Sequence, residues 1–211
     1  MTSSVVLCIA LASVFSVVDW WAVARHSKIV EYICKPAATI AFLAVAALIS
    51  VDDSLPKTWR IIALIFCVFG DVFLMLPKDA FVSGLASFAI AQMCFVAGFA
   101  TQDATMTKLI IGLTIVLPIT LFLARRFIKA IKSSGHGELV LPVAVYMVVI
   151  TAMATSAIAG GTAIGIGGAL FFMLSDSLIA ESRFVKERNW HSVGIMVTYH
   201  LALAGLALGL L

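Results

Sequence analysis

The chain has 211 residues, of which 63% are hydrophobic and 12% are charged, and its formal net charge is +3. A soluble domain carries about 25% charged residues, so this composition excludes an ordinary soluble globular protein. The net charge of +3 does not indicate a nucleic-acid partner, because the excess Lys and Arg residues lie in loops between apolar segments.

Apolar segments recur along the whole chain, each long enough to cross about 30 Å of hydrocarbon as a helix. They are continuously apolar rather than alternating, which favours helices over barrel strands. We therefore expect an all-α integral membrane protein, a single transmembrane domain over residues 1–211 with about eight helices. In chain order the predicted spans are Ser3–Ala24, Ile33–Val51, Trp59–Leu76, Phe81–Phe99, Lys108–Ala124, Leu139–Ile158, Thr162–Ala180 and Val193–Leu211.

The first span has features of a signal peptide, because the small residues 22–24 resemble a cleavage site. No basic residue precedes its apolar run, and residues 19–21 (Asp-Trp-Trp) interrupt its end, so we expect an uncleaved membrane helix. Pro36 and Pro142 lie near predicted helix starts, where a missing N–H is tolerated. Pro118 lies inside the fifth span and is a candidate kink.

Lys and Arg are unevenly divided between the two sets of alternate loops. The poorer set has Lys57, Arg60 and Lys108, and the richer set holds the other eleven of the 14. The positive-inside rule makes the richer set cytoplasmic, which predicts both termini on the non-cytoplasmic side. A bacterial inner membrane is the expected location.

Cysteines and glycines inside the spans have structural interpretations. Cys8, Cys34, Cys67 and Cys94 form no C-x-x-C pair and are predicted to be small buried residues rather than a disulfide or metal site. Small residues allow helices to approach closely. Close packing is therefore predicted at Gly160, Gly161, Gly165, Gly167, Gly168 and the pair Gly205-x-x-x-Gly209.

Three acidic residues, Asp19, Asp71 and Asp176, fall inside predicted spans. A carboxylate in a membrane helix costs several kcal/mol unless it faces the bundle interior or water. At about 1.5 Å per residue, all three lie at a similar depth below one face, which predicts a cavity open to the cytoplasmic side. For Asp19 we favour an interface position, because two tryptophans follow it.

Other polar residues lie at the same predicted level: Glu31, Lys35, Tyr146, Ser175, Ser177, Tyr199 and His200. The tyrosines are also typical packing residues, and the serines can bond to helix carbonyls. His200 has no second histidine one turn away, so a metal pair is not predicted. Asp71 and Asp176 are harder to explain structurally, because neither has a cation within one helical turn.

Two longer motifs contain these aspartates. The first is Gly70-Asp71-x-x-Leu74-x-x-Pro77 followed by Phe81-x-x-Gly84-x-x-x-Phe88, and the second is Gly168-Ala169-x-x-Phe172-x-x-Ser175-Asp176-Ser177-x-x-Ala180. Together with Lys35-Pro36 and Tyr199, they resemble the YhhN-like lysoplasmalogenase family over nearly the whole chain. Gln92 and Phe95 depart from the His and Tyr that the family pattern leads us to expect.

The resemblance implies hydrolysis of the vinyl ether bond of lysoplasmalogens to a fatty aldehyde and a glycerophospho-base, ethanolamine or choline. This chemistry needs a proton donor and a group that stabilises positive charge or activates water. We expect Asp71 and Asp176 to form a catalytic dyad that divides these roles, and the residues alone do not assign the donor. No metal or organic cofactor is predicted.

Substrate contacts are also expected from the resemblance. Lys35 or the nearby basic loop is expected to attract the phosphate of the substrate. Membrane lipid is expected to surround the protein. The predicted substrate-binding residues are Lys35, Tyr146, Ser175, Tyr199 and His200.

Two other classes remain open. An intramembrane aspartyl protease also uses two membrane aspartates, but Val68 replaces the first glycine of a G-x-G-D motif, and no Pro-Ala-Leu segment is present. A proton-coupled transporter or a lipid-binding membrane protein also accommodates buried acids. No convincing internal repeat surrounds the two motifs.

Overall fold

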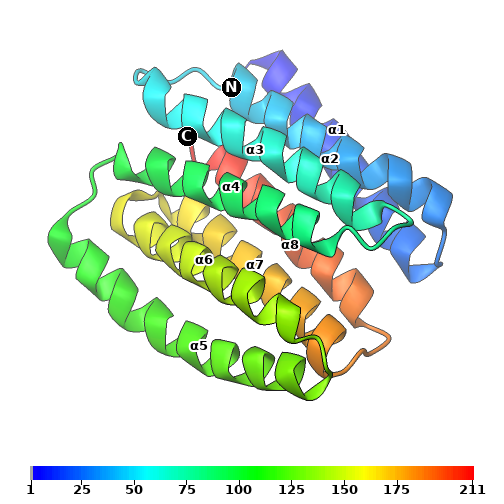
Figure 1. The fold of residues 1–211 in the computed structure, drawn as a ribbon. Coiled ribbons are helices and arrows are strands. Elements are labelled where there is room, and N and C mark those ends of the chain that lie inside the picture. The colour runs from blue at the N-terminus through cyan, green and yellow to red at the C-terminus, as the bar shows by residue number, and fades with distance from the viewer. Residues whose placement is uncertain (1) are drawn as a thin grey trace.

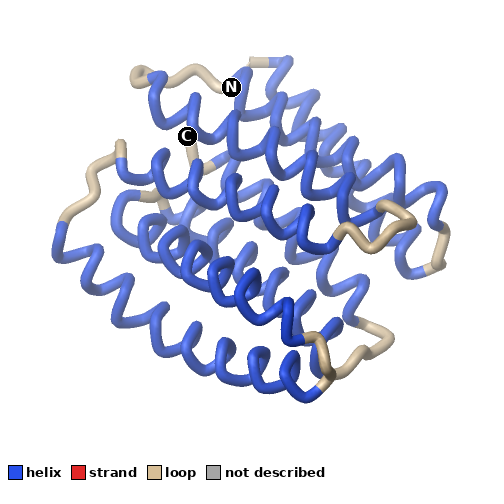
Figure 2. Tube along the Cα trace, viewed as in Figure 1, coloured by secondary structure: helices blue, strands red, loops and turns tan. Residues whose placement is uncertain are grey.

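The computed structural model describes residues 2–211, and these are almost entirely helical (Figures 1 and 2). Within that range eight helices are long and apolar enough to cross a membrane, as predicted. They are α1 (Ser3–Ala24), α2 (Lys28–Leu48), α3 (Ser54–Met75), α4 (Phe81–Ala100), α5 (Met106–Ser133), α6 (Val140–Gly160), α7 (Ala163–Ala180) and α8 (His191–Leu208). A 3₁₀ turn, Gly137–Leu139, precedes α6, and a π-helical turn, Glu181–Val185, follows α7.

Successive helices run in opposite directions, so both termini lie at the same end of the bundle (Figure 1). The opposite end is formed by residues 25–27, 76–80, 134–136 and 186–190, which connect α1 to α2, α3 to α4, α5 to α6 and α7 to α8. We call it the basic end, because most of the Lys and Arg residues are in or beside these connections. Its assignment to the cytoplasm stays a prediction.

Seven helices form a closed ring in the order α1, α2, α3, α4, α6, α7 and α8, with α8 returning to α1. Helix α8 also contacts α2 and α3, so it crosses toward the middle of the ring. Helix α5 lies outside this ring, and its principal contact is with α6 (Figure 1). The ring therefore brings residues from α2, α3 and α8 together near the basic end.

Three predicted helix boundaries are wrong by five residues or more, among them the start of α3, which is Ser54 rather than Trp59. Helix α2 begins at Lys28 rather than Ile33, so Pro36 lies in its interior instead of near its start. Helix α5 continues nine residues beyond Ala124, to Ser133. The extension keeps an apolar stripe, since Phe127 and Ile131 are buried while its charged residues, Arg125, Arg126, Lys129 and Lys132, stay exposed. The helix thus continues beyond its apolar span with an amphipathic pattern.

Helices α7 and α8 approach each other closely enough for their backbones to be in contact. A Cβ atom added to Gly168 would lie 2.6 Å from the backbone nitrogen of Leu206, and one added to Gly205 would lie 2.6 Å from the Cα of Gly168. The predicted packing roles of these two glycines are confirmed. For Gly167 the prediction is wrong, because no atom lies within 4 Å of its added Cβ.

Gly167 and Gly168 are adjacent in the sequence and provide a matched test of the packing. We expect Gly168→Ala to destabilise the protein by about 1–3 kcal/mol, because the new methyl group meets backbone that has no room to move. Gly167→Ala should leave stability unchanged or slightly raised, since alanine favours the helix. Thermal unfolding of both variants in one detergent measures the difference, and equal melting temperatures would contradict the close approach.

Candidate active site

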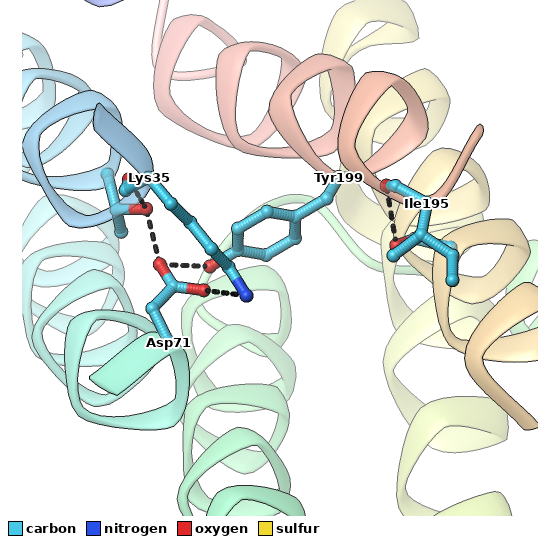
Figure 3. A network of polar contacts seen from close by, with 6 residues as sticks. Lys35, Asp71, Ile195 and Tyr199 are labelled. Carbon is cyan, nitrogen blue, oxygen red and sulfur yellow. Dashed lines mark hydrogen bonds and ion pairs between the residues drawn. The ribbon is translucent and has the colours of Figure 1, made fainter. Parts of the chain in front are cut away.

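Asp71 lies four residues before the end of α3 and is completely buried. Its Oδ2 accepts hydrogen bonds from the Thr39 hydroxyl at 2.6 Å and from the Tyr199 hydroxyl at 3.0 Å. The Lys35 ammonium lies 3.4 Å from its Oδ1 (Figure 3). Three donors from two other helices therefore surround one carboxylate.

The helix geometry explains this convergence. Lys35 and Thr39 are four residues apart on α2, so they face the same side of that helix one turn apart. Tyr199 lies two turns from the basic end of α8, and its ring faces the Lys35 ammonium, with 5.8 Å between the nitrogen and the ring centroid. The structure therefore brings together three residues predicted at one depth, Lys35, Asp71 and Tyr199.

Asp176 lies in a second polar position, on α7. Its Oδ2 accepts a hydrogen bond of 2.6 Å from the Tyr146 hydroxyl on α6, and its side chain is half-buried. Both residues line a cavity near the basic end, where the empty space, including the part open to the surroundings, is about 660 Å³. The other lining residues are largely apolar and come from α3, α4, α5, α6, α7 and the π-helical turn, among them Leu74, Phe88, Leu123, Phe127, Met147, Ile150 and Phe184.

The two aspartates have separate hydrogen-bond partners, and of the three span acids only Asp176 lines this cavity. A cluster of aromatic rings lies beside both groups. The ring of Phe88, which lines the cavity, is 5.9 Å from the ring of Tyr199, and Phe172 is 5.8 Å from Tyr199. Asp71 is thus connected to the cavity wall through Tyr199 and Phe88, rather than through direct contact with Asp176.

The remaining predicted site residues have mixed placements. Ser175 donates its hydroxyl to the backbone carbonyl of Ile195 on α8, on the other side of Tyr199 from Asp71 (Figure 3). His200 is buried, and its Nδ1 accepts a hydrogen bond of 2.9 Å from the Trp20 indole. Ser175 and His200 therefore have helix-packing partners in the structure, and their roles in substrate binding stay predictions.

Asp19 does not occupy the interface position that we favoured, because its side chain is completely buried on α1. Its oxygens accept no hydrogen bond from residues 2–211. On α4, Gln92 and Phe95 are also fully buried. Phe95 packs toward Phe172, whereas the Gln92 amide has no partner in the described chain.

Sequence reasoning missed several residues of this region. Thr39 follows Lys35 by one turn, and this spacing could have identified it. Trp20 was interpreted as an interface residue, but its indole bonds to His200 across the α1–α8 contact. At the opposite end of the bundle, Arg60 was counted among the loop charges, yet it is buried, bonds to the Leu206 carbonyl at 3.2 Å and lies 5.0 Å from the centroid of the Phe99 ring.

A family model and several curated relatives point to the same family for this chain. The sequence model of the YhhN family matches residues 30–210. The chain is 31% identical over 140 residues to a human protein named lysoplasmalogenase TMEM86B, covering 66% of this chain and 58% of that protein. It is 29% identical over 175 residues to proteins named lysoplasmalogenase from Mycobacterium bovis and Mycobacterium tuberculosis, covering 78% of this chain and 65% of each relative.

The aligned part of the chain thus spans about three fifths of the length of the curated relatives it matches. No solved structure matches it. Asp19 and Trp20 precede the segment that the family model covers, whereas the Asp71 and Asp176 positions lie within it.

The buried pair between Lys35 and Asp71 can be tested by removing its charges one at a time. Lys35→Met should destabilise the protein by about 3–5 kcal/mol, because it leaves the Asp71 carboxylate buried without a cation. The double variant Lys35→Met with Asp71→Asn should recover much of this loss. Thermal unfolding of the single and double variants measures the coupling, and independent, additive effects would mean that the two charges do not interact.

Proposed function

This chain belongs to the YhhN family, and from that premise we propose that it is a membrane-embedded hydrolase that cleaves the vinyl ether bond of lysoplasmalogens. The products are a fatty aldehyde and a glycerophospho-base. The names of the human and mycobacterial relatives support this substrate class. The observation that carries the proposal is the Asp176–Tyr146 pair in the wall of a largely apolar cavity.

The cavity suits a single-chain lipid. Its lining is apolar apart from Thr120, Tyr146, Asp176 and Ser177. We propose that the alkenyl chain lies among the apolar side chains, with its vinyl ether carbons beside Asp176.

Asp176 is the better candidate for the proton donor. Its carboxyl group accepts a single hydrogen bond, at Oδ2, from a neutral tyrosine. The other oxygen remains available to carry a proton toward the cavity. Tyr146 fixes the orientation of the Asp176 carboxyl group. Proton transfer requires such an orientation, because the carboxyl group and the carbon that receives the proton must come close together.

Asp71 has the surroundings of a carboxylate paired with a cation. It faces an ammonium group and accepts two hydroxyl hydrogen bonds, and an ionised carboxylate is an acceptor only. The Lys35 ammonium compensates this charge, so Asp71 acts on the cavity through its hydrogen bond to Tyr199, whose ring packs on Phe88 in the cavity wall. In this proposal the two aspartates have different roles, with Asp176 donating the proton and Asp71 positioning Tyr199 behind the cavity wall.

The proposed reaction balances without a cofactor. Asp176 donates its proton to the β-carbon of the vinyl ether, and the C=C π electrons form the new C–H bond while the α-carbon and the ether oxygen share the positive charge. Water then adds to the α-carbon and returns a proton to the Asp176 carboxylate. The resulting hemiacetal breaks its C–O bond to the glycerol, with the hydroxyl proton moving to the glycerol oxygen, and the aldehyde is released.

Replacement of each aspartate by asparagine tests the assignment. We expect Asp176→Asn to lower kcat by about 10²–10⁴-fold with little change in KM, because asparagine keeps the shape but cannot donate the catalytic proton. Asp71→Asn should also lower kcat, since it weakens the contact that positions Tyr199, and because it leaves the Lys35 ammonium buried without a counter-charge its kcat is compared per folded protein, measured by thermal unfolding. The exposed loop residue Asp103 provides the control, and Asp103→Asn should behave like the unmodified protein.

Aldehyde release from lysoplasmalogen by purified protein in detergent is the measurement. An enzyme produces aldehyde without a sealed membrane, whereas a proton-coupled transporter does not. Undiminished aldehyde release by both the Asp71 and the Asp176 variant would refute the assignment, and no release by the unmodified protein would refute the proposed activity.

A further inference from the structure

One edge of the cavity at the basic end is built from two segments that are far apart in the sequence. Phe81 begins α4 and Phe184 lies in the π-helical turn after α7, and both line the cavity. Their rings meet edge to face, with centroids 5.7 Å apart. The Arg183 guanidinium lies 4.2 Å from the centroid of the Phe81 ring. A cation is therefore held directly beside the aromatic edge of the cavity.

Asp79 completes this arrangement. Its Oδ2 accepts a hydrogen bond of 2.6 Å from Arg183 Nη2, and its Oδ1 accepts one of 3.3 Å from the backbone N–H of Phe81. The hydrogen bond from Arg183 holds the pKa of the Asp79 carboxyl below its usual range, so this group is charged at neutral pH. Opposite charges thus lie side by side at the cavity edge, 104 residues apart in the chain.

Both charged groups remain accessible. The side chain of Asp79 is 68% exposed and that of Arg183 is 35% exposed. Arg183 donates to Asp79 through one nitrogen, and a guanidinium has five N–H groups, so other donors are free for a ligand. Arg126 differs, because its Nε and Nη2 both donate to Glu181 in a two-point pair. Lys35 differs as well, because it is buried against Asp71.

We propose that Arg183 and Asp79 form the receptor for a zwitterionic phospholipid head group, with the guanidinium binding the phosphate and the carboxylate binding the ammonium. The proposal rests on the proposed function for the identity of the lipid, and it adds what selects the head group. A planar guanidinium matches phosphate oxygens in two-point geometry, and a carboxylate beside it matches the cation that follows the phosphate in ethanolamine or choline lipids.

The position of the pair relative to the cavity supports this assignment. A lysolipid whose chain fills the apolar cavity has its polar end at an edge of that cavity, where water or lipid head groups are accessible. Arg183 contacts Phe81, and Phe81 lines the cavity, so the charged pair is one side chain away from the buried chain. The head group and the chain can therefore be bound at the same time.

The test compares lipids that share one saturated acyl chain and differ in the head group. Lysophosphatidylethanolamine carries phosphate and ammonium, lysophosphatidylglycerol carries phosphate alone, and monoacylglycerol carries neither. None contains a vinyl ether, so binding is measured independently of the proposed hydrolysis. Competition between the lipids for purified protein, followed by native mass spectrometry, gives ratios of affinity within each variant, and such ratios are insensitive to a general loss of stability.

Three variants distinguish the role of Arg183 from that of Asp79 and provide a control. Arg183→Gln should weaken both phospholipids by about tenfold or more relative to monoacylglycerol, because a hydrogen-bonded charge is lost. Asp79→Asn should keep the backbone hydrogen bond of Phe81 and lower the preference for lysophosphatidylethanolamine over lysophosphatidylglycerol by roughly three- to tenfold. Arg126→Gln, at the same end of the bundle, should leave all ratios unchanged.

Equal weakening of all three lipids by Arg183→Gln, or the same change of ratios in Arg126→Gln, would overturn the proposal. Displacement of lysophosphatidylethanolamine by millimolar inorganic phosphate, lost in Arg183→Gln, would assign the site to free phosphate and also overturn it. If the head-group ratios change as expected while the unmodified protein releases no aldehyde, the receptor stands and the proposed hydrolysis fails.

Discussion

The buried contact between Lys35 and Asp71 is the constraint on which this arrangement depends. A lone charged carboxylate among apolar helices is unfavourable, and a lone ammonium is equally so, and here each of the two side chains compensates the charge of the other. The hydroxyls of Thr39 and Tyr199 complete the set of donors. Because these groups come from α2, α3 and α8, satisfying one carboxylate fixes the relative positions of three helices.

That fixed cluster leaves the second aspartate in a different setting. Asp176 faces a cavity and has one hydrogen-bond donor, whereas Asp71 is sealed from the cavity behind Tyr199 and Phe88. Two carboxyl groups at similar depth thus differ in charge compensation and in accessibility. A difference of this kind allows two chemically identical side chains to have different roles in one reaction.

The sequence was sufficient to predict the helices, because the energetic cost of exposing backbone to lipid leaves a continuous apolar segment few alternatives. The same reasoning identified Asp71 and Asp176, since a charge in a span needs an explanation. It did not identify which of them borders a cavity, because that depends on how Phe88, Leu123 and Phe127 pack in three dimensions. Pro36 was misplaced because hydropathy marks the apolar part of α2 and not its polar first turn.

The position of α5 outside the closed ring has a consequence for access from the membrane. Thr120, Leu123 and Phe127 of this helix form part of the cavity wall, yet the helix packs chiefly on α6 and takes no part in holding Asp71. An outward tilt of α5 would open the cavity sideways to the surrounding leaflet and leave the Lys35–Asp71 contact intact. A lipid that is already dissolved in the bilayer could then enter laterally, without first passing through water.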